Sequence, residues 1–136
     1  MFHLAAQAGV RSSWGRAFDV YTQDNILATQ RLLEAARRHR DLRKVVFASS
    51  SSVYGEAHAL PMRETSPTQP HSPYGVTKLA AEHLCELYRR NFGLSTVSLR
   101  CFSVYGPRQR PDMAFHKFIE AALAGRSVAI LGDGLQ

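Results

Sequence analysis

Tyr74 and Lys78 stand four positions apart, a spacing that could make a tyrosine base. In a helix this spacing puts both side chains on one face, one turn apart. A free phenol ionises near pH 10, so holding it poised near pH 7 takes about 3 pKa units, or roughly 4 kcal/mol. One positive charge about 4 Å away supplies on the order of 4 kcal/mol at an effective dielectric constant of 20. The ammonium of Lys78 is therefore large enough in effect to help Tyr74 accept a proton.

Such a pair alone is a weak signal, because it also arises by chance on the surface of solvated helices. Its surroundings make it informative. A run of four serines, residues 49–52, precedes the pair at the end of an apolar and β-branched stretch. Ser72 and Pro73 supply an N-cap and a first helical residue, which would fix Tyr74 in the first turn of a helix.

Strand and helix patterns alternate along the chain. Strands are predicted at residues 1–6, 44–49, 95–101 and 127–131, and helices at about 19–40, 73–92 and 112–124. This alternation predicts an α/β protein with a doubly wound parallel sheet and right-handed crossovers. In such sheets the chemistry lies at the carboxyl ends of the strands, where polar residues occur at 5–7, 49–52 and 102–108.

The net charge of +6 raises the question of a nucleic-acid partner. The densest basic run, residues 37–44, falls at the expected end of a helix, where cations complement the negative pole of the helix dipole. We therefore expect a solvated helix terminus and no nucleic-acid partner. Recognition of an anionic substrate remains the alternative interpretation of the charge.

Other classes of function are disfavoured by composition. The two cysteines are too few for a disulfide framework or a thiolate metal site, and the six histidines show no metal-ligand spacing. No stretch approaches the roughly 18 apolar residues that a transmembrane helix needs. We expect a cytoplasmic protein with no metal site and no membrane association.

Four segments in order resemble signatures of the NAD-dependent epimerase/dehydratase family, a branch of the extended short-chain dehydrogenases/reductases. They are residues 3–11, 47–55, 70–78 and 99–108. The first is similar to the strand end that contacts the cofactor in UDP-glucose and UDP-glucuronate 4-epimerases. The resemblance implies a partial NAD-binding Rossmann domain over residues 1–111, followed by the beginning of a small substrate-binding region over residues 112–136.

The same resemblance implies that Ser50, Tyr74 and Lys78 are catalytic. Tyr74 would take the proton of the sugar's 4-hydroxyl while NAD accepts hydride from the same carbon. Lys78 would hold the nicotinamide ribose, and Ser50 would hydrogen-bond the reacting oxygen. Matches to cofactor-contacting positions are Leu4, Ala5, Ala6, Gln7, Ala8, Asn25, Ser49, Tyr74, Lys78 and Phe102. Matches to substrate-contacting positions are Ser50, Ser51, Tyr74 and Ser103.

Ser51 and Ser52 bear on which reaction is expected. Dehydratases of this superfamily place an Asp-Glu pair at these positions, because elimination of water needs a second acid and base, and hydroxyls cannot replace carboxylates near neutral pH. A UDP-sugar 4-epimerase is therefore favoured. The alternatives are a nucleotide-sugar reductase, a dehydratase with relocated acids, or a non-catalytic truncated homologue that acts as an interaction module.

The glycine-rich turn that would open the family's first βαβ unit has no counterpart in this sequence. A helix N-terminus at that turn would be the main docking site for the cofactor's pyrophosphate. The resemblance thus implies an internal fragment of an enzyme that is a homodimer when complete. We expect the 136-residue chain by itself to bind NAD poorly and to show no appreciable turnover.

Overall fold

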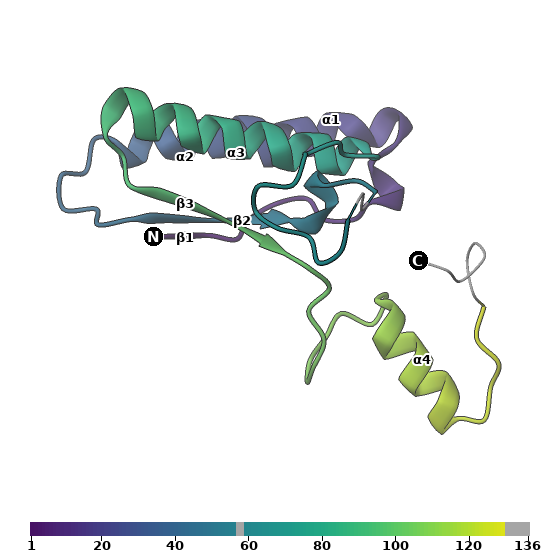
Figure 1. Cartoon of the computed structure of the whole chain (residues 1–136). Coiled ribbons are helices and arrows are strands. Elements are labelled where there is room, and N and C mark those ends of the chain that lie inside the picture. Colours follow the sequence, from purple (N-terminus) through teal and green to yellow (C-terminus); the bar gives the residue numbers. More distant parts are fainter. Residues whose placement is uncertain (57–58, 130–136) are drawn as a thin grey trace. The chain divides into compact units, whose positions relative to one another are not determined.

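The structure is a computed structural model that describes residues 1–56 and 59–129. It divides into two compact units, Met1–Phe102 and Ser103–Gln136 (Figure 1). The predicted division of function after residue 111 stays a prediction. The strand expected at 127–131 is not seen at residues 127–129, and its last two residues lie outside the described part of the chain.

The first unit contains a sheet of three parallel strands. The strands are β1 (Phe2–His3), β2 (Val45–Ser50) and β3 (Thr96–Cys101), in the order β1-β2-β3. Phe2 lies opposite Val46, and Val46 lies opposite Val97. The predicted α/β class with a parallel sheet is confirmed. The first strand is shorter than the expected 1–6, because the backbone beyond it leaves the sheet and pairs with a side chain at Gln7.

The connection from β1 to β2 is helical from Phe18 to Ala36. Two short 3-10 turns, η1 (Arg11–Ser13) and η2 (Gly15–Ala17), lead into α1 (Phe18–Tyr21), the π-helical segment η3 (Thr22–Leu27) and α2 (Ala28–Ala36). The expected helix 19–40 therefore ends four residues early. The amide of His39 bonds to the carbonyl of Ala36 in a tighter turn, so most of the basic run lies just beyond the helix end.

The helix α3 (Pro73–Phe92) connects β2 to β3 through the short 3-10 turn η4 (Ser51–Val53) and a long loop. The hydroxyl of Ser72 accepts a hydrogen bond from the Gly75 amide at 3.1 Å, which satisfies one amide of the first turn. Gly93, with φ of 66°, ends the helix and donates its amide to the carbonyl of Arg89 at 3.1 Å. Both predicted helix ends are confirmed.

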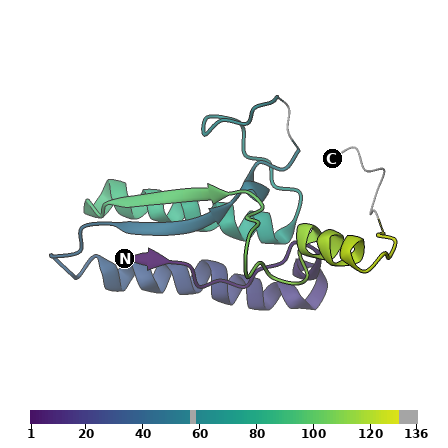
Figure 2. The same ribbon diagram turned by 90° about the horizontal axis from the view of Figure 1, so that it is seen from below.

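The helices of the first unit cover one face of the sheet (Figures 1 and 2). The core between them consists of Leu33, Ala36, Val45, Phe47, Ala81, Cys85, Tyr88 and Leu94. The strand residues that alternate with this set point to the other face, which no described helix of the first unit covers. There Phe2 is 75% exposed and Leu99 49% exposed.

The second unit contains α4 (Ala114–Leu123). Within this unit the ring of Tyr105 packs on Phe115, with 5.4 Å between ring centroids. Arg110 and Asp112 form an ion pair just before the helix, which starts two residues after the expected residue 112. Among the described residues no helix combines the length and apolar character needed to span a membrane.

Candidate active site

The candidate site lies at the edge of the sheet where the parallel strands end. Two loops begin there: residues 4–13 after β1, termed the β1 loop, and residues 51–72 after β2, termed the β2 loop. The helix α3 starts directly after the β2 loop. This arrangement brings the first turn of α3, with Tyr74, close to both loops, as the rule for parallel sheets predicts.

Tyr74 and Lys78 lie on the same side of α3. The ammonium nitrogen of Lys78 is 5.9 Å from the centroid of the Tyr74 ring, and it donates a hydrogen bond to the carbonyl of Ala48 at 2.8 Å. It also lies 5.0 Å from the centroid of the Phe47 ring. The juxtaposition expected from the spacing of the two residues is present.

The Lys78 ammonium lies in a partly dehydrated environment. Its side chain is buried between α3 and β2, where the ammonium contacts Ala48 and Phe47, and burial lowers its pKa below the ordinary lysine value. The nearby Cys101 acts in the opposite direction on that pKa, but burial is the larger cause. A buried ammonium has fewer water molecules to screen it, so its field acts more strongly on a neighbouring group than a surface lysine would.

Ser50 begins the turn over residues 50–53, termed the serine turn, which faces the start of α3. Its hydroxyl accepts a hydrogen bond from the Ser52 amide at 3.2 Å and donates one to the Ser52 hydroxyl at 3.1 Å. A Cβ atom at Gly75 would lie 2.6 Å from the carbonyl oxygen of Ser52. Only glycine permits this close approach of α3 to the serine turn, which fixes Ser50 relative to the first turn of the helix.

Ser49 and Ser51 were also predicted to be site residues. The Ser49 hydroxyl donates to the Glu82 carboxylate on α3 at 2.5 Å, and Ser51 is half-buried in the serine turn. The contact of Ser49 is therefore with the protein itself. The predicted cofactor contact of Ser49 and substrate contact of Ser51 stay predictions.

Asn25 ties the β1 loop to α3. Its side chain accepts a hydrogen bond from the Gln7 amide at 2.8 Å and donates to the Gln7 carbonyl at 3.1 Å and to the Thr77 hydroxyl at 3.0 Å. Asn25 is 1% exposed, and its predicted cofactor contact stays a prediction. It holds in place the loop whose other residues Leu4, Ala5, Ala6 and Ala8 were predicted to line the cofactor.

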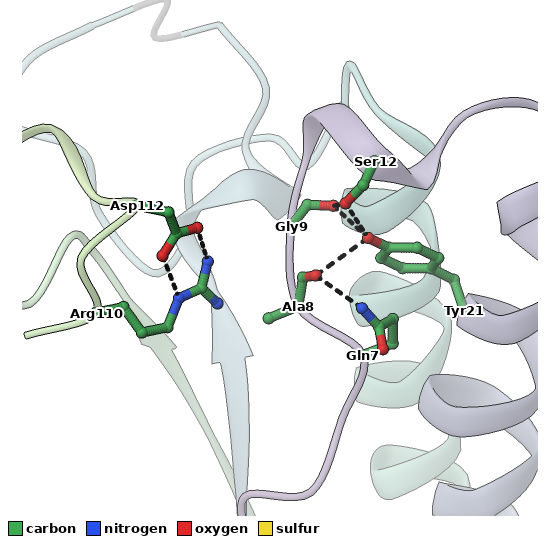
Figure 3. A network of polar contacts seen from close by, with 7 residues as sticks. All are labelled: Gln7, Ala8, Gly9, Ser12, Tyr21, Arg110 and Asp112. Carbon is green, nitrogen blue, oxygen red and sulfur yellow. Dashed lines mark hydrogen bonds and ion pairs between the residues drawn. The ribbon is translucent and has the colours of Figure 1, made fainter.

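Tyr21 was not identified from the sequence, yet it contacts both the β1 loop and Tyr74. Its hydroxyl donates to the carbonyls of Gly9 at 2.8 Å and Ala8 at 3.1 Å, and lies 2.6 Å from the Ser12 hydroxyl (Figure 3). Its ring meets the Tyr74 ring edge-on, with 6.2 Å between centroids. A recurrence at every fourth residue, with Tyr21 four positions before Asn25, is the sequence signal that could have revealed it.

An ion pair holds the β2 loop. Arg100 on β3 forms a two-pronged pair with Glu82 on α3, at 2.8 and 3.0 Å, and donates to the carbonyl of Glu64 in the loop at 3.1 Å. The guanidinium also lies 4.8 Å from the centroid of the Tyr54 ring. The sequence did not point to this pair, because the partners are 18 positions apart.

Two further predicted contacts lie near the end of β3. Phe102 is half-exposed and stacks on Tyr54, with ring centroids 6.5 Å apart. Ser103 begins the second unit. The predicted cofactor contact of Phe102 and substrate contact of Ser103 stay predictions.

The residues at this edge of the sheet have the chemical groups that a dinucleotide cofactor needs. The backbone of the β1 loop carries small, exposed side chains at Ala5 and Ala8, which allow a ligand to approach closely. The Lys78 ammonium has three donors, and the carbonyl of Ala48 takes one of them. The remaining donors suit the hydroxyl groups of a ribose.

Comparison with known proteins places this arrangement among nucleotide-sugar enzymes. Residues 1–136 match the family described as the NAD dependent epimerase/dehydratase family. The chain is 56% identical to a protein of Bacillus subtilis named uncharacterized UDP-glucose epimerase YtcB, over all of this chain and 42% of that protein.

Solved structures show the same fold. The UDP-glucuronic acid 4-epimerase of Bacillus cereus, crystallised with UDP-glucuronic acid and NAD, superposes with a TM-score of 0.90 at 53% identity, over 98% of this chain and 42% of that one. The UDP-N-acetylglucosamine 4-epimerase of Methanobrevibacter ruminantium gives a TM-score of 0.88 at 40% identity, over 99% and 44%. The predicted Rossmann-type fold is confirmed, and the chain spans less than half the length of these relatives.

Proposed function

Because the chain belongs to the NAD-dependent epimerase/dehydratase family, we propose that it forms the catalytic part of a UDP-sugar 4-epimerase, with Tyr74 as the base. The observation that carries this proposal is the position of the buried Lys78 ammonium 5.9 Å from the Tyr74 ring centroid. NAD is the cofactor of this family, and relatives of known structure were crystallised with it.

In the proposed reaction, the phenol oxygen of Tyr74 takes the proton of the sugar's 4-hydroxyl and later returns it. Bound NAD supplies a reversible acceptor for hydride. Lys78 stabilises the phenolate through its charge and binds the nicotinamide ribose. The Ser50 hydroxyl donates its proton to the Ser52 hydroxyl in this structure, and in the proposed reaction it would turn that proton to the reacting sugar oxygen and hold this oxygen against Tyr74.

The serine turn supports epimerisation over dehydration. Ser51 and Ser52 carry hydroxyl groups, and elimination of water would need an acid and a base beside the sugar. Epimerisation requires only removal of hydride, rotation of the keto sugar and return of hydride to its other face. UDP-sugars are the proposed substrates, and two copies of the complete protein are expected to pair.

The proposal can be tested with a chimeric protein. In the Bacillus cereus UDP-glucuronic acid 4-epimerase, the matching segment is replaced by residues 1–136 of this chain. We expect this chimera to interconvert UDP-glucuronic acid and its 4-epimer. Tyr74→Phe is expected to lower kcat by about a thousandfold, because the proton acceptor is removed. Products are identified by chromatography and mass spectrometry.

The matched control is Tyr88→Phe on the same helix, whose hydroxyl contacts Glu34 away from the site. We expect its kcat to stay within about twofold of the parent chimera, although its stability falls. Retention of more than a tenth of the activity by Tyr74→Phe would refute the proposal. A 4-keto-6-deoxy product would show a dehydratase instead.

A further inference from the structure

We propose that Tyr21 is a positioning residue. Its hydroxyl holds the β1 loop, which lies on the cofactor side of the site, and its ring orients the base Tyr74. This inference rests on the proposed function, since it assigns Tyr74 as the base and the β1 loop as a wall of the NAD site. Tyr21 is 1% exposed, so it reaches substrate or cofactor only through its neighbours.

The hydroxyl of Tyr21 holds the turn at residues 8–12. It donates to the carbonyls of Gly9 and Ala8 and lies 2.6 Å from the Ser12 hydroxyl, so a single oxygen joins three groups of one turn (Figure 3). The Gln7 side chain donates to the same Ala8 carbonyl at 3.2 Å. Because main-chain carbonyls are the acceptors, this hydroxyl fixes the path of the backbone and not merely a side chain.

The turn is tight around that hydroxyl. Gly9 has φ of 115°, a conformation that favours glycine, and a Cβ atom there would lie 2.6 Å from the Ser12 hydroxyl and 3.2 Å from the Tyr21 hydroxyl. The absence of a side chain at Gly9 therefore allows the backbone to pass close to the Tyr21 and Ser12 hydroxyls. Loss of the hydroxyl would loosen the turn, because the Gly9 carbonyl would keep the Ser12 hydroxyl at 3.5 Å and the Ala8 carbonyl the Gln7 side chain at 3.2 Å, both longer than their bonds to Tyr21.

The ring of Tyr21 acts on the other side. It meets the Tyr74 ring at an interplanar angle of 79°, the edge-to-face arrangement that aromatic pairs prefer. Tyr74 is only partly buried, so this contact and the Lys78 ammonium limit where its phenol can turn. A proton acceptor must sit within hydrogen-bond reach of the sugar hydroxyl, and small displacements reduce the rate.

The two parts can be separated by substitution, because Tyr21→Phe removes the hydroxyl and keeps the ring, whereas Tyr21→Leu removes both. In the chimera described above, we expect Tyr21→Phe to raise the Kd for NAD by about tenfold and to change kcat at saturating NAD by less than about twofold. Tyr21→Leu is expected to raise the Kd for NAD by a similar factor. Its kcat is expected to be about tenfold lower than that of Tyr21→Phe. Calorimetry gives the Kd, and steady-state assays give kcat.

Two controls set the scale of these effects. Ser12→Ala removes one partner of the hydroxyl and is expected to raise the Kd for NAD by about threefold. Thr22→Val, next to Tyr21 in sequence, removes an exposed hydroxyl bonded to the Phe18 carbonyl and is expected to leave both quantities unchanged. Should Tyr21→Leu fail to fold, Tyr21→Met, whose longer and more flexible side chain reaches further into the space of the ring, takes its place.

An unchanged Kd in Tyr21→Phe would overturn the role of the hydroxyl, and equal kcat in the Phe and Leu variants would overturn the role of the ring. A merely structural residue would lower the folded fraction without separating Kd from kcat. Failure of the proposed function is distinguishable, because it appears as turnover that survives Tyr74→Phe. The Kd for NAD would still decide the role of the Tyr21 hydroxyl in that case.

Discussion

The β1 loop and the β2 loop flank the same tyrosine but are held in different ways. The β1 loop is anchored by neutral groups, since Asn25 and Tyr21 bond to its main chain. The β2 loop is anchored by charge, since the Arg100–Glu82 pair reaches its main chain at Glu64. One side of the site depends on hydrogen bonds between buried dipoles, and the other on an ion pair at its border.

This difference predicts different responses to the solvent. Hydrogen bonds between neutral buried groups change little with salt, whereas partly exposed ion pairs are screened by it. The side chains of Arg100 and Glu82 retain 21% and 11% exposure. A higher ionic strength should therefore loosen the β2 loop before the β1 loop.

Gly55→Ala should disrupt the β2 loop most severely. A Cβ atom at this position would lie 1.9 Å from the carbonyl oxygen of Gln69, and φ of 69° is itself costly for alanine. We expect the free energy of unfolding of the 136-residue chain to fall by more than about 3 kcal/mol. Urea denaturation followed by circular dichroism measures it. The control is Gly93→Ala, where φ is also positive but nothing lies within 4 Å of the added atom.

Asn25→Ala should release the β1 loop. It leaves the Gln7 amide and carbonyl and the Thr77 hydroxyl without their shared partner, in a buried position. We expect a loss of about 2 to 3 kcal/mol in the free energy of unfolding, with little dependence on salt. Asn91→Ala, an exposed asparagine bonded to the Leu87 carbonyl, is the matched control. A loss that shrinks markedly in 1 M NaCl would contradict the neutral anchor.

Arg100→Met should loosen the β2 loop. We expect the free energy of unfolding to fall by about 1.5 kcal/mol, because Glu82 then loses its charged partner at a mostly buried position. The difference from the unmodified chain should shrink in 1 M NaCl, since salt weakens the pair that the substitution removes. Arg89→Met, in an exposed pair with Glu86, is expected to have a much smaller effect. A loss of stability in Arg100→Met that does not depend on salt would contradict the idea that the β2 loop is anchored by charge.

Lys78→Met should have the smallest effect on stability. Unlike the other three substitutions, it should stabilise the chain. Burial lowers the Lys78 pKa in the folded chain, so folding disfavours the ammonium, and stability rises with pH between that lowered pKa and about 10.4 for the unfolded chain. We expect the free energy of unfolding at pH 7 to increase by about 1 kcal/mol. The alkaline rise should vanish in the variant, as denaturation at several pH values would show. Destabilisation by Lys78→Met would mean that its bond to Ala48 outweighs burial.

Local patterns in the sequence predicted the scaffold well. The N-cap at Ser72, the glycine at position 93 and the alternation of strands and helices each depend on neighbours a few residues away, and all three are confirmed. The spacing of Tyr74 and Lys78 likewise fixed their common side, because a regular helix converts sequence distance into geometry.

The anchors of the two loops could not be predicted in the same way. Asn25 meets Thr77 from 52 positions away, and Arg100 meets Glu82 from a different element. Such contacts depend on the three-dimensional packing of elements, which no local period encodes. The role expected for Asn25 came from matching positions to a family, whereas the structure shows which atoms it holds.

The two cysteines differ in a way that offers a spectroscopic handle. Cys85 is buried and its pKa is raised to about 11, whereas Cys101 is exposed at the end of β3, opposite Ser50 in the strand register. Thiolates are the reactive form, so a maleimide fluorophore at neutral pH should attach to Cys101 and spare Cys85. The native chain could thus carry a single dye beside the serine turn without any engineered cysteine, and ligand arrival would be followed as a change in its emission.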